Sequence, residues 1–97
     1  MITEQQITDV IYSVIDQMNE LRDQNLIDKG LQTPLIGQRS QLDSVDLVNL
    51  LLGVEEQLED EFDISFVVAN EKALSLKNSP FRTVKTLTDY LTDSINQ

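Results

Sequence analysis

The sequence predicts an all-α domain: a small four-helix bundle with a long loop between helices 1 and 2 and a short third helix. Apolar residues recur at three- and four-residue steps in separate parts of the chain, which is the spacing of one helix face. Only 5% of the 97 residues are aromatic although 40% are hydrophobic, so the expected core is aliphatic, as suits packed helices. This length is typical of one domain, and we expect residues 1–97 to form a single domain.

The first predicted helix begins after Thr3. Thr3 and Gln6 have the spacing of a capping box, in which each side chain accepts a hydrogen bond from the other residue's backbone N–H. The helix is expected to run to about Leu21. One stripe of it is apolar and is interpreted as a wall of the core, because the opposite face is acidic rather than rich in Lys or Arg. The stripe consists of Ile7, Val10, Ile11, Val14, Ile15, Met18 and Leu21.

The segment from Arg22 to Leu42 breaks this periodicity and is predicted to be a loop. It contains Gly30, Pro34 and Gly37, which are typical of turns, and it is longer than most connections between helices. Five apolar residues are expected to anchor the loop across the helices, and these are Leu26, Ile27, Leu31, Leu35 and Ile36.

The second predicted helix begins at Asp43 or Ser44, since either side chain can accept a hydrogen bond from the first-turn amides. Asp43 and Asp46 also suit the positive end of the helix dipole. The helix is predicted to end near Glu61. At 100° per residue, one arc of it forms a core face, which contains Leu47, Leu50, Leu51, Val54, Leu58 and Phe62.

A neighbouring face of this second helix combines apolar and acidic residues. Such a mixture is typical of a docking surface, in which apolar contacts supply affinity and carboxylates steer a basic partner. The alternative is a helix buried on two sides, with the apolar residues of this face covered by the long loop. The face consists of Ser44, Val45, Val48, Leu52, Glu55, Glu56 and Glu59.

Two further helices are predicted in the last third of the chain. The apolar run Ile64–Val68 resembles a strand, but no second such run exists to pair with it, so we expect a buried turn. A short third helix is predicted over Glu71–Leu76, capped by Asn70 and ended before Pro80. Thr83 is predicted to cap the last helix, whose apolar stripe is Val84, Leu87, Tyr90, Leu91 and Ile95.

The composition argues against several functions. The chain has no His and no Cys, so no imidazole can activate a serine and no thiolate can attack, bind a metal or form a disulfide. No Gly-rich phosphate loop is present either, and we expect that the protein is not an enzyme. The net charge of −10 repels phosphate backbones and anionic lipids, so we expect basic protein partners rather than nucleic acid or membranes.

The sequence also bears on the cellular location. The N-terminus lacks the basic start and apolar run of a signal peptide, and no stretch approaches the length that membrane insertion needs. The absence of cysteine agrees with a reducing compartment. We therefore expect a cytoplasmic protein, and we expect it to be a monomer.

Ser44 is the most informative residue of the sequence. It stands at the head of an apolar helix, and the stretch from Asp43 to Asp63 contains eight acidic residues without a Lys or Arg. Because the chain offers no base to activate it, we interpret Ser44 as a serine that another protein modifies. The simpler interpretation is that Ser44 is only a helix N-cap, worth about 1 kcal/mol.

The chain resembles the acyl carrier proteins. Asp43–Val48 reads Asp-Ser-Val-Asp-Leu-Val, which is similar to the family's Asp-Ser-Leu-Asp-x-Val attachment motif, and Glu55–Leu58 falls where the family has Glu-Glu-x-Phe. The order of the predicted helices extends the resemblance over nearly the whole chain. Three residues depart from the family pattern: Val45 replaces a Leu, Asn49 stands where a Glu is common, and Gly53 lies in mid-helix, at a cost of roughly 0.5–1 kcal/mol relative to Ala.

The resemblance implies that a phosphopantetheinyl transferase attaches 4′-phosphopantetheine from coenzyme A to Ser44. The prosthetic thiol then holds acyl groups as thioesters for enzymes of fatty acid, lipid or polyketide biosynthesis. Asp43 and Asp46 are implied to flank the attachment site and to aid recognition. The departures from the family pattern suggest a carrier dedicated to one pathway.

The resemblance also implies which residues meet partner enzymes. Acyl- or ketosynthase-type enzymes and acyl-loading enzymes with basic docking surfaces are expected to contact Val45, Val48, Leu52, Glu55, Glu56 and Glu59. Two alternatives stay open at this point. One is an aminoacyl or peptidyl carrier protein loaded on the same serine, and the other is an unmodified acidic helical adaptor in which Ser44 is only a cap.

Overall fold

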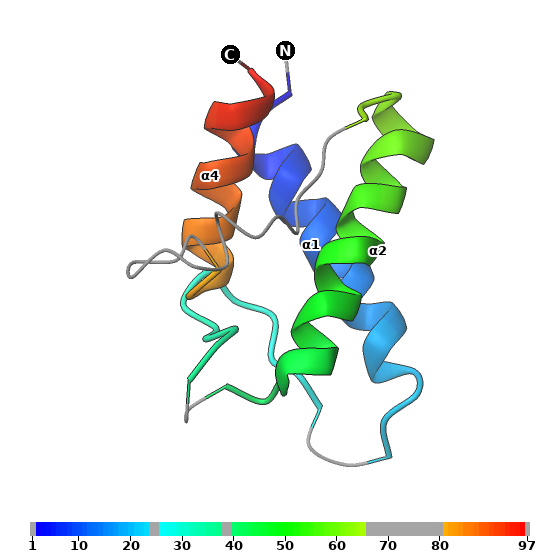
Figure 1. Ribbon diagram of the computed structural model, residues 1–97, viewed down its shortest axis with the longest axis vertical. Helices are drawn as coiled ribbons and strands as arrows, with labels where there is room; N and C mark the ends of the chain where they lie inside the picture. The colour runs from blue at the N-terminus through cyan, green and yellow to red at the C-terminus, as the bar shows by residue number, and fades with distance from the viewer. Residues whose placement is uncertain (1, 24–25, 38–39, 66–80, 97) are drawn as a thin grey trace.

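The computed structural model describes residues 2–23, 26–37, 40–65 and 81–96, and within them the fold is all-α. These residues form three helices, α1 (Glu4–Asn19), α2 (Ser44–Phe62) and α4 (Val84–Ile95) (Figure 1). They contain no strand, only an isolated antiparallel bridge between Pro34 and Thr83. The all-α class is thus confirmed, whereas four helices are not. The predicted third helix, Glu71–Leu76, lies outside the described residues.

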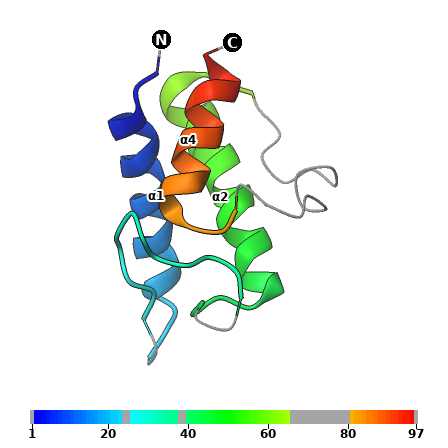
Figure 2. The same cartoon turned by 90° about the vertical axis from the view of Figure 1, so that its left-hand side faces the viewer.

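Helix α1 packs against both α2 and α4 (Figures 1 and 2). The loop between α1 and α2 lies at one end of the molecule, and both chain termini lie at the other. The Asn96 side chain joins the two ends: its Nδ2 donates to the Ile2 carbonyl at 2.7 Å, and its Oδ1 accepts from the Ile2 N–H at 3.1 Å. The start and the end of the described chain are therefore held together beside α1.

The predicted starts of α1 and α4 are confirmed, since each helix begins with a capping box. Thr3 Oγ1 accepts from the Gln6 N–H at 3.1 Å, and the Thr3 N–H donates to Gln6 Oε1 at 2.9 Å. Thr83 and Thr86 exchange the equivalent pair of bonds, at 3.1 and 2.9 Å. Within α4, a hydrogen bond to Asp89 raises the pKa of Lys85 above its ordinary value.

Helix α1 ends at Asn19, earlier than the expected Leu21. The Leu21 N–H donates to the Met18 carbonyl and the Arg22 N–H to the Asn19 carbonyl, both at 3.1 Å, which tightens the backbone into turns. Leu21 consequently leaves the apolar stripe and is 90% exposed, so its assignment to the core is wrong. The early end of α1 places Arg22 beside the beginning of α2.

Most of the core comes from the predicted stripes of the three helices, without Leu21, and residues outside the helices such as Ile2 and Leu42 complete it. Helix α2 contributes its predicted core face, with Phe62 half-buried and the other five side chains buried. Buried Thr8 and Thr88 share a hydrogen bond of 3.3 Å between α1 and α4. Phe81, which the helical spacing did not single out, is also buried and meets the ring of Tyr90 edge-on at a centroid distance of 6.1 Å.

Of the five expected loop anchors, only Ile27 and Leu35 are buried. The loop is also held through its backbone: the Leu35 N–H donates to the Arg82 carbonyl at 2.8 Å, and the Leu31 carbonyl accepts from the Lys85 N–H at 2.9 Å. These bonds fix the path of the chain without requiring its apolar side chains to be covered. The prediction that Leu26, Leu31 and Ile36 are anchors is therefore wrong, because all three are exposed.

Gly53 marks the close approach of α1 and α2. A Cβ atom at this position would lie 2.7 Å from Cγ1 of Val14, a distance that real side chains do not reach. The glycine that looked like a local weakness in the sequence thus permits the two helices to pack tightly. Helix α2 continues to Phe62 and ends with Asp63 in the left-handed conformation at φ 54°.

The segment after α2 was predicted to be a buried turn. Ile64 is half-buried and packs against the core, and its N–H donates to the Leu58 carbonyl at 3.2 Å. Ser65 is exposed. Residues 66–68 of the predicted turn lie outside the described residues, so the prediction is tested only at its beginning.

Candidate functional site

The N-terminus of α2 is capped by Asp43. Asp43 Oδ1 accepts from the Asp46 N–H at 2.7 Å, and the Asp43 N–H donates to Asp46 Oδ2 at 3.3 Å, so the two carboxylates form a reciprocal capping box. Ser44 is the first residue of the helix. The interpretation of Ser44 as the N-cap is therefore wrong, because its neighbour fills that role. Asp43 and Asp46, which precede and follow the serine in sequence, are hydrogen-bonded to each other.

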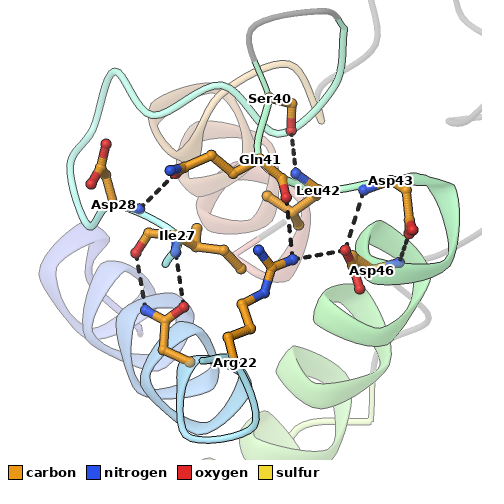
Figure 3. A network of polar contacts seen from close by, with 9 residues as sticks. Arg22, Ile27, Asp28, Ser40, Gln41, Leu42, Asp43 and Asp46 are labelled. Carbon is orange, nitrogen blue, oxygen red and sulfur yellow. Dashed lines mark hydrogen bonds and ion pairs between the residues drawn. The ribbon is translucent and has the colours of Figure 1, made fainter. Parts of the chain in front are cut away.

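Arg22 binds the first turn of α2 from outside the helix (Figure 3). Its Nη2 donates to Asp46 Oδ2 at 2.7 Å and to the Gln41 carbonyl at 3.2 Å. The side chains of Arg22 and Asp46 are only 18% and 30% exposed, so this ion pair is partly shielded from water. The stretch from Asp43 to Asp63 contains no Lys or Arg of its own, but in the folded chain Arg22 pairs with one of its carboxylates.

Sequence reasoning missed Arg22. Its partner lies 24 residues further along the chain, and helical spacing relates only residues three or four positions apart. The one available signal was composition, because Arg22 is one of only seven basic residues against 17 acidic ones. A scarce basic residue next to a helix end is a candidate for an ion pair. The sequence did not indicate which carboxylate would be its partner.

The two ends of the loop meet beside this ion pair. Asn19, at the end of α1, binds the backbone of Ile27 in both directions, at 2.8 and 3.0 Å. The Asp28 N–H donates to Oε1 of Gln41 at 3.0 Å, which joins the early loop to its last residues. Figure 3 shows these bonds together with the Arg22 contacts, and the backbone from Ile27 to Asp28 links the two sets. The residue before Ser44 is thereby connected to the C-terminal end of α1.

The predicted docking face of α2 is open to solvent in its apolar part. Val45, Val48 and Leu52 are 66%, 41% and 45% exposed, and together they form the apolar strip of α2. The alternative, in which the long loop covers them, is wrong. Residues 26–37 bond instead to the segment that leads into α4, and Figure 2 shows this part of the loop beside α1 and α4.

Acidic residues accompany the apolar strip. Glu56 and Glu59 are exposed, whereas Glu55 is half-buried. Glu56 also lines a groove of about 380 Å³ between α1 and α2, together with Gly53, Asp60 and Glu61. Among the residues that the structure describes, no basic side chain lines this groove. Acidic side chains therefore lie in two places: next to the apolar strip, and along the groove between α1 and α2.

The described residues contain no group of three or more carboxylates arranged to hold a metal ion. In the same part of the chain, no helix is both long and apolar enough to cross a membrane. Comparisons with protein-family models, with curated proteins and with solved structures found no match to this chain. The features that bear on function are therefore the residues at the start of α2 and the face that this helix exposes.

Proposed function

We propose that the protein is an acyl carrier protein. In this function, Ser44 carries a 4′-phosphopantetheine arm supplied by coenzyme A, and the thiol of the arm holds acyl groups as thioesters. The carrier presents these groups to enzymes of fatty acid, lipid or polyketide biosynthesis and catalyses no reaction itself. The proposal includes a cytoplasmic, monomeric carrier whose partners have basic docking surfaces.

One observation carries the proposal: the helix that begins at Ser44 exposes three apolar side chains beside acidic ones. Val45 and Val48 lie within the first five residues of α2, so an enzyme that binds them is brought to the serine. Burial of such side chains at an interface supplies affinity, and neighbouring carboxylates guide a basic partner into register. A surface of this kind suits a residue on which other proteins act.

The capping geometry supports the same assignment. Because Asp43 accepts the first-turn hydrogen bond, the start of the helix does not require a serine at position 44. A phosphodiester at this position would lie at the N-terminus of α2, where the helix dipole favours negative charge. The attached arm would also supply the thiol that the chain lacks, since the sequence contains no Cys.

Two other functions use the same face of α2. An aminoacyl or peptidyl carrier protein would be modified at the same serine and differ only in the group that is loaded. An unmodified acidic adaptor would bind a basic protein through the apolar strip and would leave Ser44 unchanged. The acidic residues of α2 favour acyl chemistry over aminoacyl chemistry, and modification of Ser44 separates both carriers from the adaptor.

The test is the intact mass of the protein before and after incubation with coenzyme A and a broad-specificity phosphopantetheinyl transferase. We expect the wild type to gain one phosphopantetheine group and Ser44→Ala to gain none. A wild type that keeps its original mass, in the presence of a control carrier that is modified, would leave the adaptor as the better account.

A further inference from the structure

Three segments of the chain meet at the Arg22 guanidinium: the end of α1, the last residues of the loop and the first turn of α2. Nη2 of Arg22 donates to the Gln41 carbonyl at 3.2 Å and to Asp46 Oδ2 at 2.7 Å (Figure 3). The same Asp46 oxygen accepts from the Asp43 N–H at 3.3 Å. A single carboxylate oxygen thus connects Arg22 to the cap of α2.

The environment of this ion pair indicates that it constrains the structure. Hydrogen bonds between charged groups are roughly twice as strong as neutral ones, whereas fully exposed ion pairs contribute little. The second ion pair of this region, Lys29 with Asp16, has side chains that are 46% and 56% exposed. The Arg22 and Asp46 side chains are 18% and 30% exposed, so water screens their attraction less. Removal of one partner should therefore cost more free energy than in an exposed pair.

We propose that Arg22 is a positioning residue for the modification of Ser44: its bonds to Asp46 and Gln41 hold the first turn of α2 in the geometry that the transferase requires. This inference rests on the proposed carrier function. Ser44 lies between Asp43 and Asp46, the two residues whose mutual hydrogen bonds Arg22 supports. Arg22 also offsets the charge of Asp46 close to the point where the phosphodiester adds negative charge.

The variant Arg22→Gln tests this role, with Lys29→Gln as its matched control. Each substitution removes one positive charge from the chain between α1 and α2 and breaks one ion pair with an aspartate. We expect Arg22→Gln to lower kcat/KM of the transferase by about ten-fold, since small misplacements of a reacting group cost about that much or more. We expect Lys29→Gln to stay within about two-fold of the wild type, because exposed pairs contribute little.

The split between kcat and KM distinguishes positioning from simple charge attraction. Loss of geometry at Ser44 persists when the transferase is saturated with carrier, so the decrease should appear in kcat. Arg22→Lys, which keeps the charge without the planar fork, should recover part of the rate. Asp46→Asn should lower kcat by less in the Arg22→Gln background than in the wild type, because the two residues act through one contact.

Amide hydrogen exchange tests the same idea without any enzyme. We expect Arg22→Gln to speed exchange at the Asp46 and Leu47 amides by about ten-fold, while amides in the middle of α4 keep their wild-type rates. An Arg22→Gln variant that is modified at the wild-type rate, or that exchanges these two amides no faster, overturns the role of Arg22 and leaves the carrier function intact. A wild type that is never modified overturns the carrier function and this inference with it.

Discussion

At the residue scale, we propose separate tasks for the adjacent residues Asp43 and Ser44. The Asp43 side chain caps α2, and loss of an Asp cap costs about 1 kcal/mol. We predict that Asp43→Ala lowers the free energy of unfolding by about that amount, whereas Ser44→Ala changes it little. Urea denaturation measured for both variants checks the prediction. If Ser44→Ala costs as much as Asp43→Ala, then Ser44 contributes to the helix start and its modification becomes less plausible.

Gly53 gives a second prediction at the residue scale. In an exposed helix, Gly→Ala stabilises by roughly 0.5–1 kcal/mol. At Gly53 the new methyl group would meet Val14 Cγ1 at 2.7 Å, and overpacking costs about 1–3 kcal/mol. We therefore predict that Gly53→Ala lowers the free energy of unfolding, by about 1 kcal/mol, as measured by urea denaturation.

The control for Gly53 is the double variant Gly53→Ala/Val14→Ala, compared with Val14→Ala alone. Removal of the Val14 methyl groups makes room for the new Cβ, so in that background the Gly→Ala change should become neutral or stabilising. A Gly53→Ala variant that is more stable than the wild type would show that α1 and α2 separate easily, which contradicts their tight packing at this glycine.

At the element scale, α2 presents its core face and the apolar strip on neighbouring sides. Leu52 is 45% exposed, whereas the adjacent Leu51 is fully buried. We predict that Leu52→Glu leaves the helical circular dichroism unchanged. The same variant should lower kcat/KM of the transferase by about ten-fold, which corresponds to a loss of about 1.4 kcal/mol of interaction free energy with the enzyme. Leu51→Glu should unfold the protein, because it buries a charge in the core.

The matched control for Leu52→Glu is Leu26→Glu. Leu26 is 51% exposed and lies in the loop, so this substitution adds the same charge to a leucine of similar exposure outside α2. We expect Leu26→Glu to be modified at close to the wild-type rate. Equal losses in both variants would show that added negative charge, rather than the apolar strip, determines the rate.

The sequence predicts some elements better than others. The difference follows from how far apart in sequence the interacting residues lie. The capping boxes at Thr3 and Thr83 join residues three positions apart, so a short stretch of sequence contains both partners. The same holds for the core face of α2, which follows from helical spacing alone. The loop was predicted less well, because its course depends on long-range backbone bonds, such as that from the Leu35 N–H to the Arg82 carbonyl, which no local sequence pattern indicates.

The candidate site shows the same division. Its serine, its flanking aspartates and its apolar strip lie within the first part of α2 and its cap, and the sequence predicted them as a group. The ion pair of Arg22 with Asp46 and the contact of Gly53 with Val14 were not predicted. Both depend on how α1 meets α2, which residue spacing within one helix does not determine.

At the scale of the whole molecule, the described helices form a scaffold that keeps one face of α2 open. Helix α1 supports α2 from one side and α4 from another, and the contact of Asn96 with Ile2 joins the chain ends. The net charge of −10 is carried largely by residues of α2 and its cap. In the proposed function, we expect a basic partner to approach this helix.

The carrier function is tested most directly by the intact mass after treatment with coenzyme A and a phosphopantetheinyl transferase. We predict that the protein gains a single phosphopantetheine group, that fragmentation assigns it to Ser44, and that Ser44→Ala gains nothing. A wild type that stays at its unmodified mass beside a modified control carrier, or a Ser44→Ala variant that still gains the group, would contradict it.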